Sequence, residues 1–191
     1  PTSVSQGRDF ATLMCVKGAN GSGKTHLLKG LAFMADFAVR SFSREPDDEI
    51  LVDPFYGASE PSEFFIEFGT TGGIYRYELA LDKKGVRYEV LYRTQVKRVK
   101  LFERVGDTIK YCTKAYVALE SMKFRGNASV ISTARQYELK GLEPVIKFFS
   151  GIITNVGYEG HRLRTFLDLS SVSRMFFKDP EALKLSLIHI S

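Results

Sequence analysis

Residues 18–25 constrain the fold of this chain more than any other stretch, because they read Gly-Ala-Asn-Gly-Ser-Gly-Lys-Thr. The octapeptide fits the phosphate-binding loop pattern G-x-x-x-x-G-K-[ST] at every fixed position. Glycines allow positive φ angles and bring backbone N–H groups close to the oxygens of a ligand. A ring of N–H groups followed by a helix N-terminus forms a concave anion site. The alternative is a glycine-rich turn with an incidental lysine, and the flanking sequence argues against it.

The flanks follow the order strand, loop, helix that such a site requires. Residues 13–16, Leu-Met-Cys-Val, form a short apolar run typical of a buried parallel strand. Residues 25–39 carry apolar side chains at helical spacing and predict a helix, with Gly30 as a weak point. Lys24 would reach the β- and γ-phosphates, and the Thr25 hydroxyl would ligate Mg²⁺. The candidate ATP and Mg²⁺ site therefore consists of Gly18, Asn20, Gly21, Ser22, Gly23, Lys24 and Thr25, with Thr25 as the metal ligand.

The composition is that of an ordinary globular protein, with 44% hydrophobic and 26% charged residues. A net charge of +5 permits a nucleic-acid or polyphosphate partner without requiring one. The two cysteines, Cys15 and Cys112, lie in apolar strand-like runs, which predicts buried thiols in a reducing cytoplasm. No segment approaches the roughly 20 apolar residues that span a bilayer, and no signal peptide is visible. We therefore expect a cytoplasmic protein without a membrane partner.

The hydrophobic period changes to two at Glu63. Good hairpin turns at residues 69–73 and 82–85 separate the alternating segments. The expected strands lie within residues 63–68, 74–81, 87–92, 99–104 and 108–113. This pattern predicts an antiparallel meander with one buried face and one solvent-facing face. In the connector before it, residues 50–56 suit either a short edge strand or a loop with apolar anchors, and we favour the loop.

Four basic residues cluster in and just before the fourth strand of this meander: Lys97, Arg98, Lys100 and Arg104. The simpler explanation of this cluster is a solvated strand face, and the more specific one is contact with a nucleic-acid backbone. A second basic group, at residues 161–164, is expected to be exposed.

After Ala115 the pattern becomes helical. Met122 and residues 130–137 suggest one helix, and the apolar stripe from Leu142 to Ile153, with Pro144 near its start, predicts another. Asp179 and Pro180 mark a third helix start. Residues 185–191, Leu-Ser-Leu-Ile-His-Ile-Ser, resemble a translated adapter from transposon-based sequencing libraries, the alternative being a genuine short strand. With Pro1 in place of Met, they suggest a fragment of a longer protein whose native sequence ends near Lys184.

Nucleotide hydrolysis also needs an acidic residue at the end of an apolar strand to hold Mg²⁺. The nearest candidate is Asp168, but polar residues flank it and favour a surface position. No Leu-Ser-Gly-Gly-type signature is present, and the three histidines show neither metal-ligand spacing nor a nucleophile–base pairing. The sequence therefore predicts the binding parts of a nucleotide site without the hydrolytic parts.

Residues 18–25, followed by Leu-Leu-Lys-Gly-Leu at 27–31, resemble the start of an ABC-type ATPase head. The chain is most similar to bacterial AAA-family ATP-binding proteins related to the RecF, SMC and OLD ATPases. The similarity continues through Pro54-Phe55, Ile74–Tyr77, Glu89–Tyr92 and Leu101–Arg104, and covers most of residues 12–155. In this family a β-rich subdomain follows the P-loop helix, and the Walker B acid, signature motif and switch histidine come later. A Q-loop glutamine is expected after that subdomain. Gln136 is the candidate, and a plain helix-surface glutamine is the alternative.

This resemblance implies an α/β (α+β) fold: a P-loop NTPase core fragment with an inserted antiparallel β-meander and C-terminal helices. The expected segments are the P-loop strand and helix at 1–45, the β subdomain at 46–118, a helical segment at 119–184 and the adapter-like tail at 185–191. The implied function is binding of ATP with Mg²⁺, and ATP hydrolysis in the full-length protein. The head would form a homodimer that sandwiches ATP, in DNA transactions or phage defence, with a DNA or nuclease partner.

Two other functions remain open from the residues alone. A small-molecule or nucleotide kinase uses the same loop, but it continues in β-α-β order with arginines in a lid, and the predicted meander argues against it. A nucleic-acid-binding module switched by nucleotide would use Lys97, Arg98 and Lys100.

Overall fold

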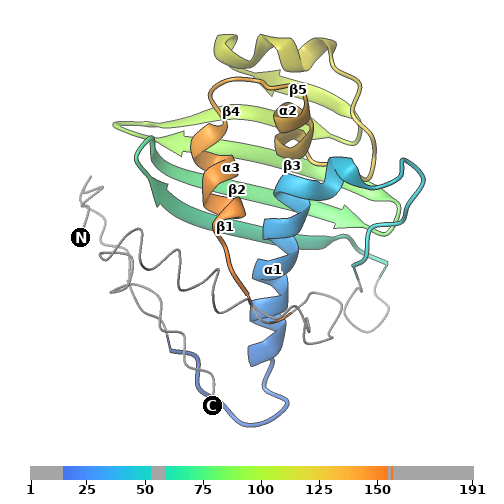
Figure 1. The fold of residues 1–191 in the computed structure, drawn as a ribbon, viewed down its shortest axis with the longest axis vertical. Helices are drawn as coiled ribbons and strands as arrows, with labels where there is room; N and C mark the ends of the chain where they lie inside the picture. Colours follow the sequence, from blue (N-terminus) through green and yellow to red (C-terminus); the bar gives the residue numbers. More distant parts are fainter. Residues whose placement is uncertain (1–14, 53–58, 155, 157–191) are drawn as a thin grey trace, which may run out of the picture.

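The computed structural model describes residues 15–52, 59–154 and 156 of the chain. A five-stranded antiparallel sheet, in the order β1-β2-β3-β4-β5, forms its centre. Three α-helices lie on one face of this sheet (Figure 1). The elements are α1 (Lys24–Arg40), η1 (Ser41–Ser43), β1 (Ser62–Thr70), β2 (Gly73–Asp82), β3 (Gly85–Thr94), β4 (Arg98–Val105), β5 (Thr108–Cys112), η3 (Lys114–Ser121), α2 (Val130–Gln136) and α3 (Glu143–Ser150). The predicted mixed fold, with its meander and later helices, is confirmed.

The strand register decides which side chains face the helices. Tyr77 on β2 lies opposite Ile66 on β1 and Leu91 on β3. Tyr77 and Leu91 are fully buried. Glu89 shares this inward face because it lies opposite the buried Leu79. The period-two pattern correctly gave the strands, and the register shows that the inward set of β3 includes a carboxylate.

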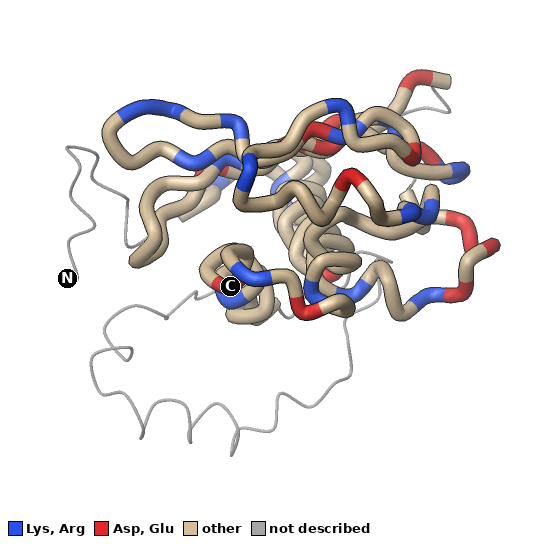
Figure 2. Tube along the Cα trace, turned by 90° about the horizontal axis from the view of Figure 1, so that it is seen from above, with Lys and Arg blue, Asp and Glu red and all other residues tan. Residues whose placement is uncertain are grey.

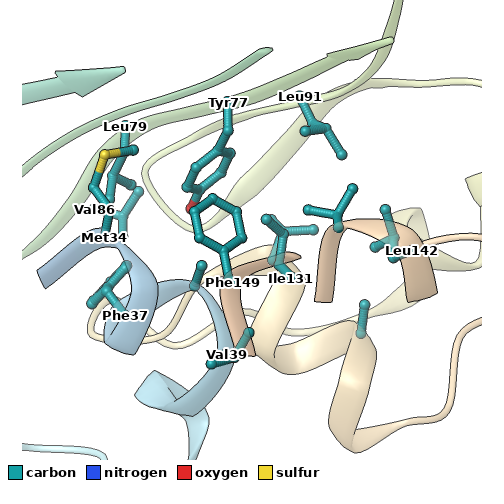
Figure 3. Close-up of a cluster of buried hydrophobic side chains, with 14 of the residues drawn as sticks. Met34, Phe37, Val39, Tyr77, Leu79, Val86, Leu91, Ile131, Leu142 and Phe149 are labelled. Carbon is teal, nitrogen blue, oxygen red and sulfur yellow. The ribbon is translucent and has the colours of Figure 1, made fainter. Parts of the chain in front are cut away.

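A layer of apolar side chains joins the sheet to the helices (Figure 3). Phe149 of α3 packs edge-on against Tyr77, with ring centroids 5.6 Å apart. Phe148 stacks on Phe68 of β1 at 3.8 Å. From α1, Met34 and Phe37 enter the same layer. Burial of these side chains, each contributing roughly 1.5–3 kcal/mol, holds the helices on this face.

The C-terminus of α1 meets the N-terminus of α2, and hydrogen bonds join the two ends. Ser129, the N-cap of α2, accepts a hydrogen bond from Ser132 N at 2.9 Å and donates one from its hydroxyl to Ala38 O at 3.1 Å. Ser129 N donates to Ser41 Oγ at 2.9 Å. Arg135 donates to Val39 O at 3.3 Å. Terminal backbone groups that have no hydrogen-bond partner within their own helix thus find one in the other helix or beside it.

A buried ion pair links the N-terminus of α2 and the loop before it to the sheet. Arg104 on β4 and Glu89 on β3 are both fully buried, and Arg104 Nη1 lies 3.4 Å from Glu89 Oε2. Glu89 also accepts hydrogen bonds from Tyr77 Oη and from Val130 N, each at 2.9 Å. Arg104 donates to the carbonyl oxygens of Gly106, Ala128 and Arg125, at 2.6, 2.5 and 2.8 Å. Burial raises the pKa of Glu89 above its ordinary value, against the opposing effect of Arg104.

This pair corrects the expectation that Arg104 belongs to a solvated basic face. The side chain of Arg104 points inward, where Glu89 and three carbonyl oxygens compensate its charge. Lys97 and Arg98 are exposed as expected, and Lys100 is half-buried in an ion pair with Glu103.

The segments that flank the sheet largely follow the predictions. Residues 49–52 form no strand, and Ile50 and Val52 are buried, so the favoured loop with apolar anchors is confirmed for its described part. Residues 53–58 lie outside the described residues. The helix predicted from the stripe between Leu142 and Ile153 starts near Pro144, but it ends at Ser150 rather than continuing to Ile153. The Gly151 amide donates to Lys147 O at 3.0 Å and closes the final turn.

We expect Glu89→Gln to lower the free energy of unfolding by about 3–5 kcal/mol, because it leaves the Arg104 charge buried without a counter-charge. Urea denaturation followed by circular dichroism measures this. The double variant Glu89→Leu/Arg104→Met should recover only part of the loss, since it removes the unpaired buried charge but leaves Val130 N and three carbonyl oxygens without their partners. Glu78→Gln, which breaks a half-exposed pair with Arg76, should cost at most about 1 kcal/mol. A Glu89→Gln protein as stable as Glu78→Gln would contradict the assignment.

Candidate functional site

The octapeptide lies at the free end of α1. The second half of this helix packs on the sheet, whereas its first half extends beyond β1 (Figure 1). Buried residues of α1 begin at Ala32, and Leu27 is 57% exposed. Residues 15–23 before the helix are exposed. The fold therefore anchors α1 by its C-terminus and presents the glycine loop at the other end.

The backbone of the loop has the conformation that its glycines were predicted to supply. Gly21 and Gly23 adopt left-handed φ angles of 82° and 87°. A Cβ atom at either position would meet no atom within 4 Å, so the space beside both residues is open. Ser22 N donates to Ala19 O at 3.2 Å and closes a tight turn. Left-handed backbone at both sides of Ser22 is readily available only to glycine.

The N-terminus of α1 carries no compensating group of its own. Its N-cap is Gly23, no side chain caps it, and the first turn contains no acidic residue. The first N–H groups of a helix, together with its dipole, favour a negative charge at this end. The helix start is therefore prepared for an anion from outside the helix.

Lys24 lies across the loop. Its ammonium donates to Gly18 O and Ala19 O, both at 2.6 Å, with Ser22 Oγ at 3.4 Å. The cation is thus held by carbonyl oxygens beside the helix start. Phosphate oxygens can compete with these carbonyls, because a charge-assisted bond to an anion is stronger than one to a neutral acceptor. The residues present therefore fit a polyphosphate group.

The glycine loop offers few protein ligands for a metal ion. Thr25 is exposed in the first turn of α1, where its hydroxyl can supply one oxygen. Among the described residues no group of three or more His, Cys, Asp or Glu side chains could hold a metal. A hard cation such as Mg²⁺ commonly takes one or two protein oxygens and completes its shell with phosphates and water. Thr25 beside a bound nucleotide fits that arrangement.

The segment before the loop differs from its prediction. Residues 15–18 form no strand, Val16 is 46% exposed, and Cys15 is exposed rather than buried. Leu13 and Met14 lie outside the described residues. A parallel strand is buried only when neighbouring strands and helices cover it, and all strand pairs of the described sheet are antiparallel. Cys112 is half-buried, and burial raises the pKa of its thiol.

Of the candidate residues that remain, Gln136 lies within the described part of the chain. Gln136 ends α2 on the exposed surface, as the helix-surface alternative predicted. Asp168, the basic group at 161–164, the helix start at Asp179 and the tail at 185–191 lie outside the described residues. The alternation of apolar and polar residues could not predict the buried Glu89–Arg104 pair, because charged residues in a strand normally indicate its solvent-facing side. No helix of the described chain combines the length and apolar character needed to cross a membrane.

Comparison with protein-family models gives one match over nearly the whole chain. The family described as "AAA domain, putative AbiEii toxin, Type IV TA system" matches residues 13–191. Searches of curated proteins and of solved structures gave no match. The matched range includes the glycine loop, α1 and the whole described sheet.

Two glycine substitutions in the same helix should act in opposite directions. Gly23→Ala forces a left-handed alanine at the N-cap and should destabilise the helix start by about 1–2 kcal/mol. Gly30→Ala lies in the helix interior, where its Cβ would meet the Phe64 ring at an ordinary 3.8 Å. It should stabilise the protein by roughly 0.5–1 kcal/mol. Urea denaturation combined with amide exchange of the first helical turn measures both. Equal effects of the two variants would show that the loop is not held in this conformation.

Proposed function

The chain belongs to this AAA-domain family of nucleotide-binding ATPases, and we propose that residues 18–25 are its ATP site. The observation that carries the proposal is the combination of an uncapped helix start with the Lys24 ammonium lying over a left-handed glycine turn. Backbone N–H groups of Gly21 and Gly23 would surround a phosphate, joined by that of Ser22 once it leaves Ala19 O, with Gly18 and Asn20 completing the turn.

The residues of the loop would have distinct tasks. Lys24 would leave the carbonyl oxygens of Gly18 and Ala19 and bind the β- and γ-phosphates. Thr25 would supply a hydroxyl oxygen to Mg²⁺, and the bound ion would neutralise charge on the phosphates. The helix dipole of α1 would add favourable electrostatic energy at the same end.

We further propose an ABC-type head related to the RecF, SMC and OLD ATPases. The support is the order of elements, since the antiparallel sheet directly follows the helix of the glycine loop. Heads of this kind bind ATP between two copies, so we propose a homodimer and Mg²⁺-dependent ATP hydrolysis in the full-length protein, acting in the cytoplasm. Roles in DNA transactions or phage defence, with a DNA or nuclease partner, belong to the same proposal. The boundaries at residues 45, 118 and 184 remain predictions.

The same order of elements disfavours a kinase. A small-molecule or nucleotide kinase would continue from the loop helix into a parallel β-α-β unit, whereas β1 to β5 form consecutive antiparallel pairs. A nucleotide-switched nucleic-acid-binding module is the second candidate, because Lys97 and Arg98 are exposed at the β3–β4 turn.

We expect Lys24→Ala to abolish Mg-ATP binding, because it removes the cation that would pair with the phosphates. Thr25→Val should weaken binding mainly when Mg²⁺ is present, since only the metal contact is lost. Isothermal titration of ATP with Mg²⁺ and with EDTA measures both effects. Lys29→Ala, which removes a lysine further along α1, is the matched control and should bind like the parent. Equal affinity of Lys24→Ala and the parent would refute the site.

A further inference from the structure

The outward face of the sheet carries a row of alternating aromatic and basic side chains, with one residue from each strand. We call it the cation–aromatic row; its members are Phe65, Arg76, Tyr92, Lys100 and Tyr111. The register places Arg76 opposite Tyr92 and Tyr92 opposite Lys100. Phe65 and Tyr111, on the two edge strands, join the row diagonally, because their direct cross-strand partners are Glu78 and Glu103. With strands about 4.8 Å apart, the row is about 19 Å long.

Cations lie over the rings along this row. The guanidinium carbon of Arg76 is 4.6 Å from the centroid of the Phe65 ring. Lys100 Nζ lies 5.8 Å from the centroid of Tyr111. Arg98, next to the row on β4, places its guanidinium carbon 4.7 Å from the centroid of Tyr92. Each ring of the row therefore has a positive charge in stacking or cation–π range.

The row is open to solvent although it is rich in aromatic groups. Phe65 is 66% exposed and Tyr111 is 44% exposed. The described α-helices cover the opposite face of the sheet (Figure 1). Cross-strand pairs stabilise a sheet, which accounts for aromatic and charged neighbours but not for large exposed rings at both ends of the row.

Positive charge predominates at the β3–β4 end of the row. Residues 95–100 contain three cations, Lys97, Arg98 and Lys100, and no acidic residue, whereas Arg93 lies opposite the buried Tyr75 on the helical side of the sheet. Figure 2 shows Lys and Arg gathered on this hairpin, at its upper left. Glu103 pairs with Lys100 and Glu78 with Arg76. No ion pair within the described part of the chain involves Lys97 or Arg98, so these charges are available to an anionic partner.

We propose that this outward face binds single-stranded nucleic acid, with bases stacked along the cation–aromatic row and phosphates on the β3–β4 turn. Proteins bind single strands through aromatic rings that stack on bases and a basic surface that follows the backbone. Arg guanidinium planes serve as stacking surfaces as well. Stacking on aromatic rings depends little on the identity of the base, so binding is expected to tolerate different sequences. This site is separate from the glycine loop and does not depend on ATP.

Fluorescence anisotropy of the full chain with labelled oligo-dT and oligo-rU of roughly 15 nucleotides tests the proposal. Saturable binding is expected, with affinity falling as salt rises at a log–log slope of about −0.7 per contacted phosphate. Phe65→Ala and Tyr111→Ala should each weaken binding about 5- to 150-fold, the range for loss of one stacking ring. Arg98→Ala should weaken binding and make the salt slope less steep.

Matched controls lie on the helical side of the molecule. Tyr137→Ala removes an aromatic ring that is 59% exposed, and Lys140→Ala removes an exposed cation; neither should change the affinity. Lys24→Ala should also bind the oligonucleotides like the parent, which separates this test from that of the ATP site. Absence of saturable binding would overturn the proposal. So would equal losses in the row and control variants, tighter binding to a duplex, or equally effective competition by polyglutamate.

Discussion

The buried pair of Glu89 and Arg104 is the interaction on which the rest of the structure depends. Removing two charges from water is costly, and their attraction alone seldom compensates. Here each charge also has hydrogen-bond partners, because Glu89 accepts from Tyr77 and Val130, and Arg104 donates to three carbonyl oxygens. These partners come from β2, from α2 and from the loops on either side, so the pair fixes the sheet to the segment before α2. An apolar pair could fill the space, but it could not satisfy these backbone groups.

From this pair the structure extends to the glycine loop through a short series of contacts. Val130, bonded to Glu89, is the first residue of α2, and its neighbour Ser129 holds the last turn of α1 through Ala38 O. α1 has 17 residues, hence a length of about 25 Å. The loop therefore projects from an anchor that lies a whole helix away. Few contacts with the sheet restrain the first half of α1, which leaves the loop exposed while its orientation stays defined.

The sequence predicted those parts that depend on local chemistry. The glycine loop follows from the residues at 18–25, the meander from period-two alternation and its turns, and α1 and α3 from helical spacing. The inward Arg104 could not be predicted, because its burial requires Glu89 from another strand and carbonyl oxygens from the loop near residue 126. The prediction of a buried strand around Cys15 was wrong for a related reason, because an apolar run indicates burial only if other segments cover it. Both errors concern partners that are distant in sequence.

The sheet separates the two proposed sites, and this placement limits how they can influence each other. Tyr77 of β2 faces the helical layer, whereas its neighbour Arg76 faces outward in the cation–aromatic row. A movement of α1 could reach the row through β1, because the Phe33 ring of α1 lies 5.1 Å from the ring of Phe64, the neighbour of Phe65, and through the packed layer that contains Tyr77 and Phe149. The Ser129 bonds and the Glu89–Arg104 pair oppose sliding of α1 across that layer. Coupling between nucleotide and the outward face would therefore require a displacement of α1 relative to β1 or to that layer. Without such a displacement the two proposed sites would bind their ligands independently, since allostery needs two states that both ligands distinguish.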